Sequence, residues 1–324
     1  MHPFTTEADK AIGAIGEAEL IGRIRSWLGP CTPAAPYGMG DDCAVLQKKS
    51  NLSAIDPVIY GKHFDDSVSP QDAGAKLLKR NLSDIAAMGG KPNDALLALT
   101  PSANLRLDWI EQFIGGLREV AERYGVTIIG GDVAEAPGEA FIAHLTITGF
   151  AEKPIPRRGA KTGDTLWVTG SLGGSIIGKH YNFEPRLREG QWLADHGSVR
   201  GMIDLTDGLS KDLPQLLPDG AVALLNLDQI PLSYEAHSMA QKSNQVPLYH
   251  AFSDGEDYEL AFALAAEAEP EAFLKAWKNE FELPLTCIGQ ISTVSEMSDD
   301  RLLNSETQKA ISFGNGYEHL FIRP

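Results

Sequence analysis

The amino-acid sequence predicts a mixed α/β (α+β) protein made of two domains. The chain has 324 residues, which is more than one hydrophobic core usually organises. Short apolar runs of strand type alternate with longer amphipathic runs of helix type through both halves. Two prolines within residues 153–156 mark the expected connection between the halves. We therefore expect one domain at residues 1–152 and a second at residues 153–324.

The N-terminal half is expected to form helices packed on a sheet. Residues 73–88 have a clear helical pattern, and this helix should end at Gly89-Gly90, with Pro92 just beyond. The remaining elements follow from the spacing of apolar residues. They are helices at 15–28 and 108–124, and strands at 44–46, 52–59, 96–99, 126–129 and 141–150.

The expected helix at 73–88 carries a carboxylate, Asp84, at the border of its apolar arc. Lys76, Arg80 and Ser83 fall on the opposite, polar side. A charge at the edge of a packed face needs a partner or a metal ion. Arg80 lies four residues before Asp84 and could form an ion pair with it. A surface ion pair and a metal ligand therefore both remain open for Asp84.

The C-terminal half is expected to contain strands at 164–168, 202–205, 221–227 and 260–264. A Gly-rich turn at residues 169–175 follows the first of these strands. A strand, a Gly-rich turn and the start of a helix can together cradle a phosphate. Many such turns are Gly-rich for steric reasons alone, so both interpretations remain open.

Composition excludes several classes of function. The net charge of −16, without any run of basic residues, argues against a nucleic-acid partner. No apolar run reaches the length of about 18 residues that a membrane span needs, and the N-terminus lacks the apolar region of a signal peptide. The cysteines, Cys31, Cys43 and Cys287, form no Cys-x-x-Cys pair and are odd in number. We therefore expect a cytoplasmic protein without disulfides.

Aspartates at strand ends and helix flanks predict a site for magnesium and phosphate. Magnesium prefers oxygen ligands and usually reaches a protein through a few carboxylates plus substrate phosphates. For a single Asp, a role in a turn or helix cap is the alternative, and for Asp41, Asp207 and Asp254 it has about equal weight. The carboxylates expected at the site are Asp42, Asp56, Asp84, Asp132, Asp204 and Asp207.

Phosphoryl transfer is the chemistry that such carboxylates favour, because it depends on positioning and on cations that offset phosphate charge. Arg157 or Arg158 could contact a phosphate, and His63 a substrate, although a lone His is more often structural. The sequence contains no Gly-x-x-x-x-Gly-Lys-Ser/Thr loop and no Gly-rich loop combined with His-Arg-Asp. A kinase with this sequence would belong to neither of those two large classes.

Seven ordered motifs resemble the thiamine-monophosphate kinase family, from about residue 16 to the Gly-Tyr-Glu-His at 316–319. They are spread in order over most of the chain, so the signal is specific. They are Gly-Asp-Asp-Cys-Ala at 40–44, Gly-Lys-His-Phe at 61–64, Asn-Leu-Ser-Asp-Ile-Ala-Ala-Met-Gly at 81–89, Gly-Gly-Asp at 130–132, Arg-Arg-Gly-Ala at 157–160, Ile-Asp-Leu-Thr-Asp-Gly-Leu at 203–209 and Gly-Glu-Asp-Tyr-Glu-Leu at 255–260.

The resemblance implies the two-domain fold of the aminoimidazole-ribonucleotide synthetase superfamily, with N-terminal domains paired in a homodimer and ATP near that interface. It implies direct transfer from ATP to thiamine monophosphate, with several Mg²⁺ ions. By resemblance, Asp84, Asp132 and Asp204 are the catalytic carboxylates, and all six aspartates named above are metal ligands. ATP contacts would fall on Gly131, Asp132, Arg157 and Thr206, and substrate contacts on His63, Glu256 and Tyr317.

The sequence departs from the family pattern around Asp56. The family usually has hydroxyl residues just before this Asp, and here Ala54 and Ile55 occupy those places. Tyr60 is unusually bulky for the position before Gly61. Two alternatives therefore remain beside the thiamine-monophosphate kinase. One is another ATP-using member of the superfamily with a different acceptor, and the other is a non-catalytic nucleotide-binding paralogue.

Overall fold

The computed structural model of the protein describes residues 44–46, 51–293, 300–314 and 316–317. The expected helix at 15–28, the expected ligand Asp42, and Cys31 and Cys43 lie outside these residues. Within the described part of the chain, no helix is long and apolar enough to cross a membrane.

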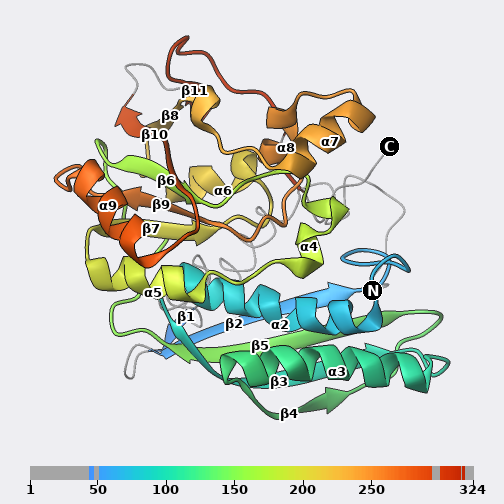
Figure 1. The fold of residues 1–324 in the computed structure, drawn as a ribbon. Helices are drawn as coiled ribbons and strands as arrows, with labels where there is room; N and C mark the ends of the chain where they lie inside the picture. The colour runs from blue at the N-terminus through green and yellow to red at the C-terminus, as the bar shows by residue number, and fades with distance from the viewer. Residues whose placement is uncertain (1–43, 47–50, 294–299, 315, 318–324) are drawn as a thin grey trace, which may run out of the picture.

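The N-terminal half forms a five-stranded sheet in the order β1-β2-β5-β3-β4. Its strands are β1 (Ala44–Leu46), β2 (Asn51–Ile59), β3 (Lys91–Pro101), β4 (Thr127–Val133) and β5 (Phe141–Phe150). All neighbouring strands are antiparallel except β3 and β4, which are parallel. The helices α2 (Pro70–Ala87) and α3 (Leu107–Tyr124) lie along one face of this sheet (Figure 1).

The C-terminal half forms a six-stranded sheet in the order β11-β8-β10-β6-β9-β7. Only β11 and β8 are parallel. The strands are β6 (Thr165–Thr169), β7 (Val199–Asp204), β8 (Ala221–Leu225), β9 (Leu260–Leu264), β10 (Leu285–Thr293) and β11 (Leu302–Asn304). The helical segments are η4 (Ser175–Ile177), α4 (Lys179–Asn182), α5 (Leu187–His196), α6 (Leu209–Leu216), η5 (Leu227–Gln229), α7 (Tyr234–Ser243), α8 (Pro247–Ser253) and α9 (Pro270–Glu280).

Helix α2 begins where its sequence supplies start signals. The Ser69 side chain accepts a hydrogen bond from the Asp72 N–H, and Pro70 occupies the first turn, where its missing N–H costs nothing. The chain leaves the helix through Gly89, whose positive φ of 68° suits glycine. The close approach of α3 also requires glycine, because a Cβ on Gly74 would lie 1.8 Å from the Phe113 carbonyl oxygen.

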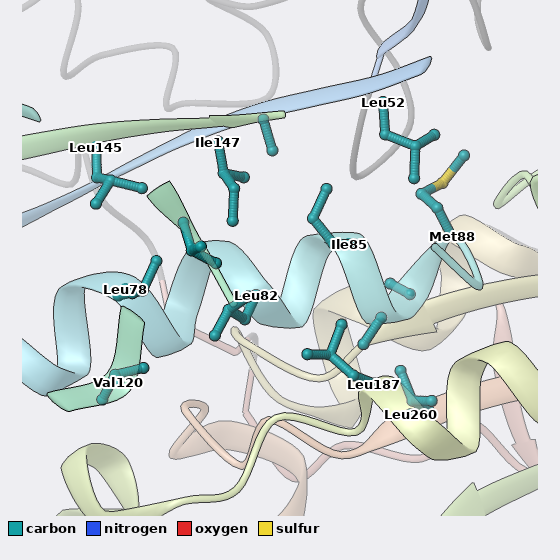
Figure 2. Close-up of a cluster of buried hydrophobic side chains, with 14 of the residues drawn as sticks. Leu52, Leu78, Leu82, Ile85, Met88, Val120, Leu145, Ile147, Leu187 and Leu260 are labelled. Carbon is teal, nitrogen blue, oxygen red and sulfur yellow. The ribbon is translucent and has the colours of Figure 1, made fainter. Parts of the chain in front are cut away.

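Helix α2 is buried on two sides, which the sequence did not indicate. Leu78, Leu82 and Ile85 belong to a core cluster that reaches Leu145 and Ile147 of the first sheet. The same cluster continues to Leu187 of α5 and Leu260 of β9, as Figure 2 shows. Because α2 lies between the two halves, its polar side faces protein as well. Lys76 is 0% exposed and Ser83 1%, so the side opposite the apolar arc, where the sequence places these residues, is buried as well.

Most of the expected elements are confirmed, with shifts at their ends. The strands at 141–150 and 260–264 have the expected bounds. The strand expected at 96–99 is longer, because β3 pairs with β5 from Lys91 onward. The strand expected at 126–129 continues to Val133, so the Gly-Gly-Asp segment at 130–132 lies inside β4 and not in a turn after it.

Candidate active site

A cleft of about 810 Å³ lies where α2 and β2 of the first half face the second sheet. Seven carboxyl side chains and four lysines or arginines are among its lining residues. This excess of carboxylates suits a site that receives further cations together with an anionic ligand. The lining residues are Asp56, Lys62, His63, Arg80, Asp84, Arg157, Ile176, Asp204, Thr206, Asp207, Lys211, Asp212, Gln215, Met239, Asp254, Glu256, Tyr258 and Tyr317.

The structure brings nine of the twelve expected site residues to this one cleft. Gly131 and Asp132 are not among its lining residues, and Asp42 lies outside the described residues. The nine residues come from positions that are far apart in the sequence. They are Asp56, His63, Asp84, Arg157, Asp204, Thr206, Asp207, Glu256 and Tyr317.

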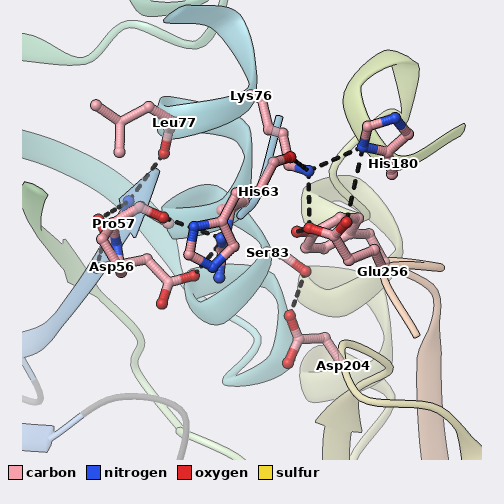
Figure 3. Close-up of polar contacts among 12 residues, drawn as sticks. Asp56, Pro57, His63, Lys76, Leu77, Ser83, His180, Asp204 and Glu256 are labelled. Atoms are coloured by element: carbon pink, nitrogen blue, oxygen red, sulfur yellow. Dashed lines mark hydrogen bonds and ion pairs between the residues drawn. The ribbon is translucent and has the colours of Figure 1, made fainter. Parts of the chain in front are cut away.

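Asp204 connects the two halves at the base of the cleft. It ends β7 and is 2% exposed. Its Oδ2 accepts a hydrogen bond of 2.5 Å from the Ser83 hydroxyl of α2 (Figure 3). Asp84, the next residue of α2, also lines the cleft. Two carboxylates expected to be catalytic therefore line the same cleft, each on a regular element that fixes its position.

The turn at residues 206–207 is held by Asp212, a residue that the sequence reading missed. The Asp212 Oδ2 accepts hydrogen bonds from the N–H groups of Thr206 and Asp207, at 2.9 and 2.8 Å. Burial, reinforced by the charge of Asp207, raises the pKa of the Asp212 carboxyl to about 8. A signal was present, because Asp212 falls on the apolar face of α6 with Leu209 and Leu213.

Asp207 also binds the C-terminal segment to the cleft. The Lys211 ammonium lies 2.9 Å from the Asp207 Oδ2 and donates to the Tyr317 carbonyl oxygen at 2.8 Å. The Tyr317 N–H donates to the Asp207 carbonyl oxygen at 3.0 Å. The Lys62 ammonium lies 5.1 Å from the centre of the Tyr317 ring, which is within reach of a cation–π contact.

Asp56 forms an ion pair with Arg80 of α2. The Arg80 Nε lies 3.1 Å from the Asp56 Oδ2, and Nη1 donates to the Pro57 carbonyl oxygen at 2.9 Å. The sequence left open an ion pair of Arg80 with Asp84, and in the structure Arg80 pairs with Asp56 instead. The Asn81 side chain accepts from the Asp56 N–H at 3.1 Å. Consecutive residues of α2 therefore hold both the side chain and the backbone of Asp56.

Glu256 is held by a buried lysine. The Lys76 ammonium lies 2.8 Å from the Glu256 Oε1 and donates to the His63 carbonyl oxygen at 2.7 Å (Figure 3). It also lies 3.0 Å from the His180 Nδ1. Burial lowers the pKa of Lys76 to about 8, and burial together with Lys76 lowers the pKa of His180 to about 4. The sequence placed Lys76 on the polar side of its helix and gave no reason to single out His180.

The Gly-rich turn at 169–175 is not an open phosphate cradle. The Gly173 N–H donates to the Asp257 Oδ1 at 2.9 Å, and the Gly174 N–H donates to the Asp254 Oδ2 at 3.0 Å. Carboxylates of the chain therefore take the place of a phosphate. Burial raises the pKa of Asp257 to about 7. The turn positions the 254–257 segment. Of the two interpretations left open by the sequence, the structure favours a turn that is Gly-rich for steric reasons.

Asp132 lies on the far side of the first sheet from Asp56. Asp132 pairs with Ala98 of β3, Ala98 pairs with His144 of β5, and His144 pairs with Pro57 of β2. Three strand spacings correspond to about 14 Å. Because neighbouring residues of a strand face opposite sides, Asp132 shares the face of Pro57 and not that of Asp56. Within one chain, Asp132 and the cleft carboxylates do not converge.

The donor set of the cleft fits magnesium that arrives with a nucleotide. Asp84, Asp204 and Asp207 offer only hard oxygen donors. Among the described residues, no group of three or more His, Cys, Asp or Glu side chains is arranged to enclose a metal ion. A protein-only cage is therefore absent from this part of the chain. Magnesium typically uses one or two carboxylates and completes its coordination with phosphates and water, which is what this arrangement allows.

Comparison with known proteins gives the class of the fold first. Residues 40–151 match the family described as AIR synthase related protein, N-terminal domain. A solved structure described as AaThiL complexed with AMPPCP and TMP superposes with a TM-score of 0.80 at 25% identity, covering 95% of this chain and 98% of that one. The hydrogenase maturation protein HypE in complex with ATP shares the fold, at 19% identity with a TM-score of 0.63. The protein therefore has the AIR synthase-like fold.

Sequence relatives give the particular family. The thiamine-monophosphate kinase of Rhodopirellula baltica is 37% identical over 286 residues, which cover 85% of this chain and 87% of the relative. The thiamine-monophosphate kinase of Escherichia coli K12 is 33% identical over 309 residues, covering 86% and 91%. The chain belongs to the thiamine-monophosphate kinase family.

Proposed function

We propose that the protein transfers the γ-phosphoryl group of ATP to thiamine monophosphate. The bond between the γ-phosphorus and its bridging oxygen breaks, an oxygen of the acceptor phosphate bonds to that phosphorus, and ADP leaves. The observation that carries this proposal is the convergence of Asp84, Asp204 and Asp207 with Arg157 and Lys211 on one cleft. Direct transfer needs positioned carboxylates and cations and no covalent intermediate.

The carboxylates and the cations of the cleft have separate roles. Asp84, Asp204 and Asp207 would hold Mg²⁺, which offsets charge on the phosphates when it is bound. Lys211 is tied to Asp207 and to the Tyr317 carbonyl, so it reaches the cleft from a fixed position. The Arg157 Nη1 donates to the Gln215 side chain at 2.7 Å. This bond orients a planar guanidinium that can bind a phosphate with two parallel hydrogen bonds.

The acceptor is proposed to bind between the turn at 61–63 and the segment at 254–258. The Ile59 N–H donates to the His63 Nδ1 at 3.0 Å, so a neutral His63 carries its proton on Nε2. Glu256 supplies a carboxylate, and Tyr317 an aromatic ring that can stack on a heterocycle. Ile176 and Met239 add apolar surface to the same cleft. An apolar wall beside charged groups suits a ligand that combines a ring system with a phosphate.

We also propose a homodimer formed through the outer face of the first sheet. Ile55, Leu96 and Phe150 lie on three strands of this face and are 59%, 46% and 45% exposed. Exposed apolar side chains gathered on one sheet face are typical of an interface. Asp132 lies on the same face, so the proposed ATP contacts at Gly131 and Asp132 belong to this interface region.

Substitution of the outer face tests the dimer. Leu96→Lys should convert the dimer to a monomer in light scattering coupled to gel filtration, because a buried lysine without a partner is costly. Leu107→Lys is the matched control, since Leu107 is 85% exposed at the start of α3, on the other face. A monomeric wild-type protein at micromolar concentration would contradict the proposal.

The two sheets also support the division at residues 1–152 and 153–324, which we retain as a proposal. Every strand of the first sheet ends by Phe150, and every described strand of the second begins at Thr165 or later. A cytoplasmic location is proposed as well, because ATP is the phosphoryl donor.

A product assay tests the reaction. Purified protein is mixed with Mg-ATP and thiamine monophosphate, and thiamine diphosphate and ADP are followed by chromatography. Equal amounts of both products support the proposal. Nucleotide binding without thiamine diphosphate would contradict it, and would indicate another acceptor or a non-catalytic paralogue.

Two substitutions test the carboxylates. Asp84→Asn and Asp204→Asn should each lower kcat by at least about a hundred-fold, because each removes a charge that stabilises the transferring group. Thermal melting of both variants should remain close to that of the wild type. Asp108→Asn is the control, since its ion pair with Arg106 is exposed and contributes little. Near-normal activity in both cleft variants would refute the assignment.

A further inference from the structure

We propose that Arg80 is a fixed cation of the active site, which neutralises Asp56 and presents a hydrogen-bond donor to a phosphate oxygen. Asp56 is then not a metal ligand in this protein, although the family resemblance places a metal there. The inference rests on the proposed function, because it concerns the charge that the nucleotide phosphates meet. It arises from the ion pair between these two residues.

The pair is anchored at several points. The Arg80 Nε–H is directed to the Asp56 Oδ2 at 3.1 Å, and Nη1 donates to the Pro57 carbonyl oxygen at 2.9 Å. The Arg80 side chain is 9% exposed and that of Asp56 27%. Arg80 comes from the middle of α2, a helix buried on two sides, so the guanidinium cannot leave Asp56 without unpacking its aliphatic stem. A metal ion would have to displace a cation that the fold holds in place.

The two residues before Asp56 offer no side-chain oxygen that would favour a metal ion over Arg80. Ala54 has no donor and is 8% exposed in the core. Ile55 is 59% exposed and points to the outer face of the sheet, away from the cleft. The backbone of both residues is paired with β5, at Ile147 and Thr146. The family's hydroxyl residues before this Asp are replaced by Ala54 and Ile55, and Arg80 pairs with Asp56. Both differences favour an arginine over a metal ion as the partner of Asp56.

Arg80 retains donors for a ligand. A guanidinium carries five N–H groups, and the hydrogen bonds of Arg80 to the described residues use only Nε and Nη1. Arg80 also lines the cleft, beside Asp84. The Nη2 group is thus available to a phosphate oxygen. Arginine stays charged at every physiological pH and matches phosphate geometry, so its charge is independent of the magnesium concentration.

Manganese binding in the presence of a non-hydrolysable ATP analogue tests this inference without measuring turnover. Bound Mn²⁺ is counted by electron paramagnetic resonance in the wild type and in Asp56→Asn, Arg80→Gln and the double variant. Asp84→Asn is the control for loss of a true ligand, and thermal melting verifies that each variant is folded. Arg80→Lys keeps the charge, and serves as the second variant if Arg80→Gln fails to fold.

The expected results differ for each variant. Asp56→Asn should leave the number and affinity of bound Mn²⁺ unchanged. Asp84→Asn should weaken Mn²⁺ binding at least about ten-fold. This is the smallest loss of affinity typical even of residues that only hydrogen-bond to a metal ligand. Arg80→Gln releases the Asp56 carboxylate, so it should add one ion or tighten Mn²⁺ binding about ten-fold. The double variant should lose this gain. Arg80→Lys should resemble the wild type in its Mn²⁺ count.

Two results would overturn the inference, and they are distinct. If Asp56→Asn loses Mn²⁺ as Asp84→Asn does, Asp56 is a metal ligand and this inference is refuted, while the proposed function stands. If the wild type binds no Mn²⁺ with the ATP analogue, the proposed function and this inference are both refuted.

Discussion

Lys76 provides a test of how the cleft is charged. Its ammonium is fully buried and reaches three acceptors, the His63 carbonyl, His180 and Glu256. Burial lowers its pKa from the ordinary value of 10.5 to about 8, against the opposing effect of Glu256. We predict that Lys76→Met changes how the free energy of unfolding depends on pH, in a direction that follows from this pKa.

The magnitude follows from the difference between the folded and the unfolded chain. One pKa unit corresponds to about 1.4 kcal/mol, so a pKa of about 8 means that charging Lys76 destabilises the folded state by about 3 kcal/mol. Between pH 8 and 10.5 the unfolded chain binds this proton and the folded protein does not. The stability of the wild type relative to Lys76→Met must therefore rise with pH in this window. From pH 8 to pH 9.5 the expected rise is about 2 kcal/mol.

Urea unfolding of the ligand-free proteins measures the effect. The free energies of unfolding of the wild type and of Lys76→Met are compared at several pH values from about 7 to 9.5. Glu256→Gln is the mechanistic control. Without the neighbouring carboxylate, the pKa of Lys76 falls further, and the rise should begin at lower pH. A difference between wild type and Lys76→Met that stays constant across this range would show that the reasoning is wrong.

Two further predictions concern the frame around the site. Glu259→Gln should lower the free energy of unfolding by about 3–5 kcal/mol, because it leaves two cations, Lys179 and Arg186, without their buried partner. The control is Glu280→Gln, in an exposed ion pair. It should change the free energy of unfolding by less than about 1 kcal/mol in the same urea titration. Gly116→Ala should destabilise by at least about 1–3 kcal/mol, because its Cβ would lie 1.9 Å from a carbonyl oxygen of α2. Gly115→Ala, with no atom within 4 Å of the added Cβ, should stabilise α3 by up to about 1 kcal/mol, and equal melting temperatures for the two alanine variants would contradict this account.

The sequence predicted the elements well where one face of each is buried. The strand at 141–150 alternates between buried and half-buried residues, so its pattern was sufficient. The strand expected at 126–129 stopped before the two glycines of the segment at 130–132. A Cβ on Gly131 would lie 1.7 Å from the Leu97 carbonyl oxygen, so this glycine serves strand pairing and not a turn. Local sequence does not distinguish these two uses of glycine.

The cleft was predictable to the extent that its residues stand in short motifs. Asp84, Asp204 and Glu256 were found in this way, and the structure brings them together. The roles of Lys76 and Arg80 as partners of Glu256 and Asp56 could not be predicted, because they depend on which distant segments α2 contacts. Arg80 had a plausible partner four residues away, and only the register of β2 beside α2 assigns it to Asp56 instead.

Helix α2 explains why the active site and the core cannot be varied separately. Lys76, Arg80, Ser83 and Asp84 are spaced four, three and one residues apart, so at 3.6 residues per turn they form a single stripe. The apolar residues of the same helix hold it against both sheets. Three side chains of the stripe each bind a different segment of the cleft. Lys76 binds Glu256, Arg80 binds Asp56, and Ser83 binds Asp204. A rotation of α2 by a fraction of a turn would break all three contacts together, so the packing of one helix sets the geometry at which the phosphates are bound.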